Sequence, residues 1–200
     1  MTAMHKFSYG LFVLTAKDGD KDNGCIINTA LQVTTDPKQV SICVNKANYT
    51  HEMIKNTKKF NLSFLTEKTS FDIFTRFGFQ SGKDVDKLEG LDEAARADNG
   101  IMYLTKSANA MVSVDVSQMI DLGTHTMFIG EVTEDKVLCD DSSCTYQYYF
   151  DHIKPAPNAE KTKKKGWVCK ICGYVYEGEE LPPDFICPIC KHGVEDFEPL

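Results

Sequence analysis

The sequence predicts a mainly β fold, in which a β-barrel with a few helices precedes a small metal-binding module. Short runs rich in Val, Ile, Thr and Phe recur along roughly the first 150 residues, separated by polar turns. These runs do not alternate with helices in the βαβ rhythm of a parallel sheet, and the sequence has no glycine fingerprint for a nucleotide. Near the end of the chain, two Cys-x-x-Cys pairs stand fourteen residues apart.

The first β-type runs are separated by clear turn signals. Phe7–Ala16 is apolar, and Lys17–Gly24 is a polar turn that carries two Gly and three Asp. Cys25–Thr35 resumes the β pattern before Asp36–Pro37. The remaining predicted strands are Gln39–Val44, Phe60–Leu65, Ile101–Leu104, Ala110–Val116 and Thr126–Val132. Short strands with brief connections are typical of an antiparallel barrel.

Two helices are predicted between these strands. Asn48 or Thr50 can cap a helix over about residues 49–57, because Asn and Thr accept hydrogen bonds from free amides at helix starts. Thr69 or Ser70 can cap a second helix that ends at Phe77. This second helix repeats Phe every three residues, which favours packing in the core over a cofactor-binding stripe. The repeated residues are Phe71, Phe74 and Phe77.

Charge and length divide the chain into three parts. Residues 154–165 carry five Lys against one Glu together with two Pro, which is typical of an exposed linker. We therefore expect a first domain over residues 1–153 and a small domain over residues 166–200. The small domain is acidic, since its two Lys and seven acidic residues give −5. It is too short to fold on apolar burial alone, and a bound metal would make up the difference.

The bulk composition excludes several classes of function. The net charge of −7 argues against binding of nucleic acid, and no run approaches the length of a transmembrane span. Leu11–Ala16 is short, lacks a small-residue cleavage site and runs into a turn, so we expect a strand and no signal peptide. These features predict a cytoplasmic protein. Cys25, Cys43, Cys139 and Cys144 show no paired spacing and are expected to be reduced thiols, with a regulatory pair of Cys139 and Cys144 as the alternative.

The other four cysteines have the spacing of a metal site. Two tight turns that each present two thiolates can enclose Fe or Zn tetrahedrally, whereas two disulfides are the alternative in a secreted protein. The metal-ligand candidates are Cys169, Cys172, Cys187 and Cys190. The spacing alone leaves iron and zinc open.

The residues around these cysteines resemble rubredoxin. The first pair continues as Cys-Gly-Tyr-Val-Tyr, the second is Cys-Pro-Ile-Cys, and an acid–Phe pair stands near the end of the chain. Trp167, Phe185 and Phe197 add aromatic bulk around the pairs. The resemblance covers residues 166–200, and it implies a single iron bound by four cysteines, with zinc as the alternative.

Four stretches of the first domain together resemble the flavin reductase family. They begin at Gly24 (GCIINTALQVTTDP), Cys43 (CVNKANYTH), Phe77 (FGFQSGKDVDK) and Gly123 (GTHTMFIGEV). The resemblance runs through most of residues 1–150. It implies an FMN-binding split β-barrel, NAD(P)H as electron donor and a homodimer.

The resemblance also implies roles for individual residues. It places Asn28, Thr29, Ala30 and Thr34 along the flavin ring and ribityl chain. It places Cys43, Val44, Asn45 and Lys46 along the other edge of the flavin. For the phosphate it implies Asn48, Thr50 and His51, since free amides at a helix start suit an anion. Phe77, Ser81 and Gly82 would complete the pocket from the same subunit or from the partner.

His125 occupies the histidine of the family's Gly-Asp-His segment, near the place where nicotinamide docks, with Thr124 in place of the Asp. For three of these residues a plainer role stays open. Lys46 could be a surface lysine, His51 an exposed helix residue, and His125 a hydrogen-bonded structural histidine.

The whole chain resembles the high-molecular-weight rubredoxins of anaerobes. The resemblance implies that hydride from NAD(P)H reduces FMN, that single electrons pass through the iron, and that a flavodiiron protein accepts them for reduction of NO or O2. Two alternatives stay open. One is a reductase of free flavin whose zinc ribbon serves only for docking, and the other is a carrier that another protein reduces in place of NAD(P)H.

Overall fold

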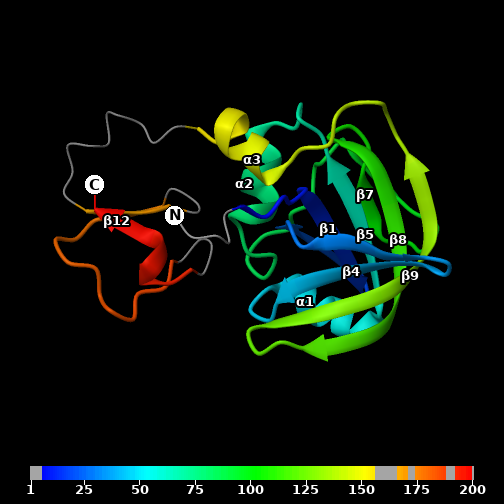
Figure 1. Cartoon of the computed structure of the whole chain (residues 1–200), viewed down its shortest axis with the longest axis horizontal. Coiled ribbons are helices and arrows are strands. Elements are labelled where there is room, and N and C mark those ends of the chain that lie inside the picture. Colours follow the sequence, from blue (N-terminus) through cyan, green and yellow to red (C-terminus); the bar gives the residue numbers. More distant parts are fainter. Residues whose placement is uncertain (1–5, 156–165, 171–173, 188–191, 200) are drawn as a thin grey trace. The chain divides into compact units, whose positions relative to one another are not determined.

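The computed structural model describes residues 6–155, 166–170, 174–187 and 192–199. The chain forms two compact units, Met1–Ile153 and Lys154–Leu200, and each has its own hydrophobic cluster (Figure 1). None of the helices within these described ranges has the length and apolar character needed to cross a membrane.

Seven antiparallel strands form the sheet of the first unit, in the order β2-β1-β5-β8-β9-β4-β3. The two edge strands, β2 and β3, follow each other in the chain and are joined only by Asn28–Thr29. The edges therefore meet at one end of the sheet, and the sheet curls into a barrel that is split between β2 and β3 (Figure 1). This confirms the predicted mainly β fold. The strands are β1 (Phe12–Asp18), β2 (Lys21–Ile27), β3 (Ala30–Thr35), β4 (Lys38–Asn45), β5 (Lys59–Leu65), β8 (Ala108–Asp121) and β9 (His125–Val137).

Strand β1 is buried on both faces and separates two cores. Phe12 and Leu14 point into the barrel, where helix α1 (Tyr49–Thr57) adds Met53 and Ile54. Leu11 and Val13 point to the opposite side, where helix α2 (Phe71–Gly78) packs. Both predicted helices are confirmed. The core role of the phenylalanine repeat is confirmed as well, because Phe74 and Phe77 are buried and Phe71 packs against their cluster.

Several boundaries differ from the expected ones. The predicted turn Lys17–Gly24 is mostly strand, because β2 begins at Lys21 and pairs with β1 from Asp18↔Lys21 onward. The connection is only Gly19–Asp20, and Gly19 takes the positive φ of 58° that such a tight turn needs. The predicted strand Cys25–Thr35 is two strands, divided at Asn28–Thr29. The remaining short elements of this unit are β6 (Ala94–Arg96), β7 (Met102–Leu104), α3 (Tyr146–Tyr148) and the π-helical turn η2 (Tyr149–Ile153).

The β8–β9 hairpin is longer than the predicted strands, and it bends. Its register shifts between Ser113 and Val114 and again between Val116 and Gln118. Gly130 pairs with Val116 between these irregularities. A β-carbon built on Gly130 would lie 2.4 Å from the carbonyl oxygen of Asp115, which is a backbone atom that cannot yield easily.

The Gly130→Ala variant should therefore destabilise the first unit by about 1–3 kcal/mol, the usual cost of overpacking a tight core. Gly78→Ala is the matched control. At Gly78 the nearest atom to an added β-carbon is a flexible Ile26 side-chain carbon at 3.4 Å. We expect Gly78→Ala to change the free energy of unfolding by less than about 1 kcal/mol. Urea unfolding followed by circular dichroism measures the free energy of unfolding of both variants. Equal destabilisation by the two substitutions would contradict the close approach of Gly130 to the Asp115 backbone.

The second unit is a small three-stranded antiparallel sheet in the order β11-β10-β12. Its strands are β10 (Trp167–Cys169), β11 (Val175–Tyr176) and β12 (Phe197–Pro199), with a 3₁₀ turn η4 (Val194–Asp196) before β12. Among the described residues of this unit, Cys169, Cys187 and Phe197 form a buried cluster, with five partly buried apolar residues packed against it. That a metal contributes to the folding of so short a domain stays a prediction.

Candidate flavin and metal sites

The first part of the candidate site lies where the barrel split meets the end of β4. Thr29, in the β2–β3 connection, donates its Oγ1 hydrogen to the Cys43 carbonyl oxygen at 2.7 Å. Asn45, the last residue of β4, pairs with His125 at the start of β9. Three segments far apart in the sequence thus converge here: the β2–β3 connection, the end of β4 and the start of β9.

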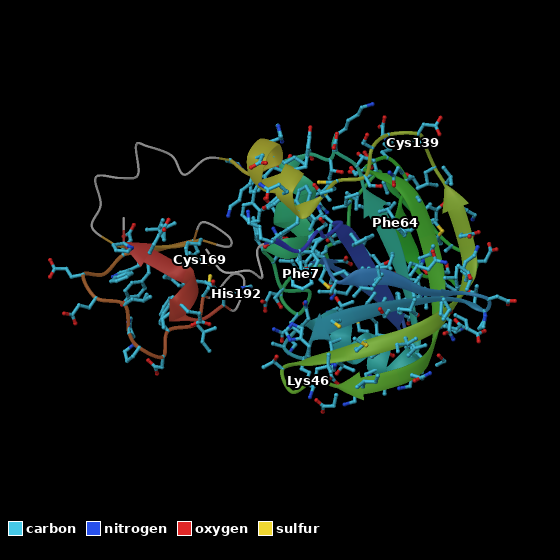
Figure 2. All side chains as sticks on the ribbon, viewed as in Figure 1. Phe7, Lys46, Phe64, Cys139, Cys169 and His192 are labelled. Atoms are coloured by element: carbon cyan, nitrogen blue, oxygen red, sulfur yellow. The ribbon has the colours of Figure 1, made fainter. Side chains whose placement is uncertain are left out.

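Lys46 ties this region to the turn between β8 and β9. Its backbone N–H donates to the Thr124 carbonyl oxygen at 3.0 Å, and its Nζ lies 2.7 Å from Oδ1 of Asp121. Figure 2 labels Lys46 beside this turn. Asp121 also accepts a hydrogen bond from the Gly123 amide at 2.7 Å. The turn before His125 is therefore held by one lysine through both its backbone and its side chain. His125 itself contacts Thr124 Oγ1 through Nδ1 at 2.9 Å.

The Lys46 bond lowers the pKa of the Asp121 carboxyl below its usual range, and the Gly123 amide adds to this effect. A carboxyl whose pKa is lowered by folding loses its contact as the pH falls through that lowered pKa. We therefore expect the carboxyl carbon of Asp121 to titrate by NMR below a normal aspartate. In Lys46→Met the midpoint should rise toward the usual value. An unchanged midpoint in that variant would mean that the ion pair does not form in solution.

The start of α1 supplies the second part of the site. Asn48 precedes the helix in an extended conformation and makes no side-chain capping bond, so its side chain leaves the amides of the first turn uncapped. Thr50 and His51 are buried. His51 lies 2.8 Å from Thr126 Oγ1 through Nε2 and 3.1 Å from Glu52 Oε1 through Nδ1. The plainer role of His51 as an exposed helix residue is wrong, because its ring is only 3% exposed.

A third segment reaches this helix start through Asn23. Its Nδ2 donates to Thr50 Oγ1 at 2.9 Å, and both side chains are buried. Gly82 lies against the other end of the same amide, since a β-carbon at Gly82 would stand 2.0 Å from Asn23 Oδ1. The structure thus brings the loop with Ser81 and Gly82 to the first helix within one subunit.

Not every predicted flavin residue joins this cluster. Thr34 lies at the far end of β3, where its hydroxyl contacts Pro37 and Gln39 beside the hairpin turn. The side chains of Val44 and Phe77 are buried in the cores on either side of the sheet. Asn28 and Ala30 flank Thr29 at the barrel split and are partly exposed. Direct contacts of all these residues with a flavin stay predictions.

Sequence reasoning missed three residues of this region: Asn23, Lys87 and Asp121. Asn23 lies inside a segment that was expected to be a turn, and Lys87 ends the FGFQSGKDVDK stretch, in which only Phe77, Ser81 and Gly82 were given roles. The residue spacing gave no signal for either. Asp121 could have been found, because an acid two residues before a turn Gly often accepts the amide of that Gly.

The metal-ligand candidates lie in the second unit. Cys169 and Cys187 are 1% and 0% exposed and belong to one cluster, although eighteen positions separate them. The amide of Cys169 donates to the Tyr174 carbonyl oxygen, and the amide of Cys187 donates to the His192 carbonyl oxygen, each at 2.8 Å. Each first cysteine thus closes a loop of the same length around its Cys-x-x-Cys pair. Figure 2 labels Cys169 and His192 in this unit. Cys172 and Cys190 lie outside the described residues.

Comparison with known proteins identifies both units. Residues 4–157 match the flavin reductase like domain, and residues 167–198 match the rubredoxin-like domain of rubrerythrin. The chain therefore belongs to the flavin reductase family, and it carries a rubredoxin-like domain at its C-terminal end. It is an oxidoreductase of the flavoprotein class.

Among particular proteins, the chain is 34% identical to the high molecular weight rubredoxin of Moorella thermoacetica, over 99% of this chain and 98% of that protein. It is 35% identical to a ferric-chelate reductase (NAD(P)H) of Archaeoglobus fulgidus, over 74% of this chain and 86% of the other. The solved structure of the Streptomyces globisporus NADH:FAD oxidoreductase SgcE6, in complex with NAD and FAD fragments, has the same fold. Its TM-score is 0.63 at 23% identity, over 76% of this chain and 88% of that one.

Proposed function

We propose that this protein oxidises NAD(P)H with a bound FMN and delivers single electrons through a rubredoxin-type iron to a separate redox protein. One observation carries the proposal: a polar site at a barrel split and a buried pair of cysteines, Cys169 and Cys187, occur on one chain. FMN would supply hydride acceptance with one-electron release, and iron held by four thiolates would supply a one-electron relay. The likeness to a high molecular weight rubredoxin along the whole chain supports both halves.

The residues at the start of α1 fit a flavin phosphate. The amides of the first turn lack a side-chain cap, and the N-terminus of a helix attracts anions through its dipole. The neutral donors and acceptors Thr29, Asn45 and Asn48 fit the heteroatoms of a flavin ring and its ribityl chain. In this proposal His125 and the Lys46–Asp121 pair position the edge of the site where the nicotinamide docks.

The second unit fits a metal held by Cys169, Cys172, Cys187 and Cys190. The two described cysteines are buried together among aromatic rings, with Phe185 5.4 Å from Phe197 between ring centroids. The backbone amides of Cys169 and Cys187 each donate to a carbonyl oxygen beyond the pair, and an apolar surround tunes the potential of a thiolate-bound metal. We propose iron in this site, with zinc as the competing metal.

We propose a homodimer that forms through the edge strand β3. Leu31 and Val33 on this strand are 68% and 43% exposed, and an open apolar edge invites pairing with a second chain. A groove of about 290 Å³ opens beside them and is lined by apolar side chains from β1, β4, β5, β8 and β9. These side chains are Phe12, Val40, Leu62, Phe64, Val112 and Val132.

We propose a flavodiiron protein as the electron acceptor. The acidic domain of residues 166–200, with its net charge of −5, would favour encounter with a basic surface on that partner. Raising the ionic strength should therefore slow electron delivery to the acceptor and leave oxidation of NAD(P)H by the flavin unchanged. A rate that is independent of salt would argue against electrostatic docking.

Two experiments separate this function from its alternatives. Metal analysis of the purified protein should find about one iron per chain, whereas a colourless zinc form would favour a free-flavin reductase with a docking ribbon. Anaerobic mixing with NADH and, separately, with NADPH should bleach the flavin absorbance with at least one of them. If neither nucleotide bleaches it, the protein is a carrier that is reduced by another protein.

A further inference from the structure

Lys87 is a buried lysine, and its ammonium lies inside the first unit. It is only 3% exposed, although lysines are almost never buried without partners. Its Nζ donates to the Gly24 carbonyl oxygen at 2.9 Å and to the Phe77 carbonyl oxygen at 3.1 Å. One of these oxygens belongs to β2 and the other to the last turn of α2, so a single side chain joins the two elements.

The position suits a cation for two reasons. Phe77 lies in the last turn of α2, where unpaired carbonyls and the helix dipole favour positive charge. Cys25, which follows Gly24, is buried close enough for its thiol to interact electrostatically with Lys87. Burial lowers the pKa of Lys87, and this cost must be balanced by the carbonyl bonds.

Lys87 also closes a loop. The chain leaves α2 at Gly78, passes through Ser81 and Gly82, and returns at Lys87 to the same helix end. Arg76 also binds the end of this loop. Its Nη1 donates to the carbonyl oxygens of Lys87 and Glu89 at 3.2 and 3.0 Å. Both ends of the loop are therefore fixed to the end of α2.

The closed loop is linked to the start of α1 through Asn23 of β2. Gly82 lies against the Asn23 side chain, and Asn23 donates a buried hydrogen bond to Thr50 at 2.9 Å. Cys25 stands two residues further along the same strand, faces the same side as Asn23 and is buried as well. A buried polar chain thus runs from Lys87 to the first turn of α1, and every member of it lies within one subunit.

We infer that Lys87 is a positioning residue for the phosphate end of the flavin site: it anchors the Ser81–Gly82 loop to β2 and so fixes Asn23 and Thr50 at the start of α1. The inference rests on the proposed flavin site. It assigns a role to a residue that need not touch the cofactor and that serves by holding the groups around the phosphate.

The test compares FMN with riboflavin, which lacks the phosphate. In Lys87→Met we expect FMN affinity, measured by fluorescence titration of the apoprotein, to fall at least about tenfold, while riboflavin affinity changes less than about twofold. Lys87→Arg should keep part of the preference, because it restores a cation that can donate to the same carbonyls. Equal losses for both flavins, or no loss for either, would overturn the inference.

Lys106→Met is the matched control, since it removes the same charge from an exposed position between β7 and β8. It should leave both affinities unchanged.

If Lys87→Met does not fold, Gly82→Ala tests the same contact from the other side, because its β-carbon would push the loop away from Asn23. This variant should show the same selective loss of FMN, and a uniform loss would overturn the inference. Wild-type protein that binds neither flavin would instead refute the proposed function.

Discussion

The Cys169→Ser variant should lose its metal and the folded second unit, while the unit Met1–Ile153 stays folded. Cys169 is 1% exposed and lies in one cluster with Cys187 and Phe197, and a unit this short cannot fold on apolar burial alone. A serine hydroxyl replaces a thiolate poorly, and metal binding in such modules contributes on the order of 10 kcal/mol to folding. Bound iron should fall from about one per chain to a small fraction, as measured by elemental analysis.

In the same variant, reduction of the flavin by NAD(P)H should be unchanged, and electron delivery to the protein acceptor should fall by at least about a hundredfold. Cys139→Ser is the control, because Cys139 is an exposed thiol of the first unit. It should keep both activities. Normal delivery to the acceptor in Cys169→Ser would remove the metal from the route, and loss of flavin reduction would show that the two units do not function separately.

The Leu31→Asp variant should convert the proposed dimer into a monomer. Leu31 is 68% exposed on an edge strand beside an apolar groove, and a carboxylate there would have to be buried without a partner in the interface. Because interface residues of this kind often contribute 2 kcal/mol or more, we expect at least about a thirtyfold weaker dimer. Size-exclusion chromatography with light scattering measures the change.

Val137→Asp is the control for this substitution. Val137 is 80% exposed at the end of β9 and does not line the groove. It should leave the dimer intact. A wild-type monomer, or a Leu31→Asp protein that remains dimeric at low micromolar concentration, would contradict the proposed interface. The monomeric variant also shows where the flavin binds, because retained FMN affinity means that one subunit completes the site.

The overall fold could be predicted because its signals are local. Short apolar runs, a residue of the capping type before each helix and the two cysteine pairs each follow from a few neighbouring residues, although neither Asn48 nor Ser70 makes a side-chain capping bond. The predicted boundaries of strands and turns were wrong where pairing with a neighbouring strand sets the boundary. Lys21–Asn23 looks like a turn in isolation, yet its register with β1 makes it strand. The break at Asn28–Thr29 was also invisible, since it exists because β2 and β3 end on opposite edges of the sheet.

The site was predictable only where a side chain carries a recognisable chemistry. The cysteines belong to such a pattern, and the resemblance placed Thr29, Asn45 and His125 in segments that the fold brings to one end of the barrel. Lys87 could not be found in this way. Its burial depends on two backbone carbonyls that only the packing of α2 on β2 supplies. Thr34 shows the reverse. It is close to Thr29 in sequence, but the extended strand β3 carries it to the other end of the strand, beside Pro37 and Gln39.

We propose that a flavin and an iron on this chain exchange electrons. The most direct measurement is the visible spectrum of the purified protein during anaerobic addition of NADH or NADPH in a stopped-flow instrument. We expect a flavin spectrum together with the absorption of ferric iron bound by cysteine. During the reaction, loss of the flavin band should be followed by loss of the iron bands. A flavin that bleaches while the iron bands persist, or a protein with no iron bands at all, would contradict it.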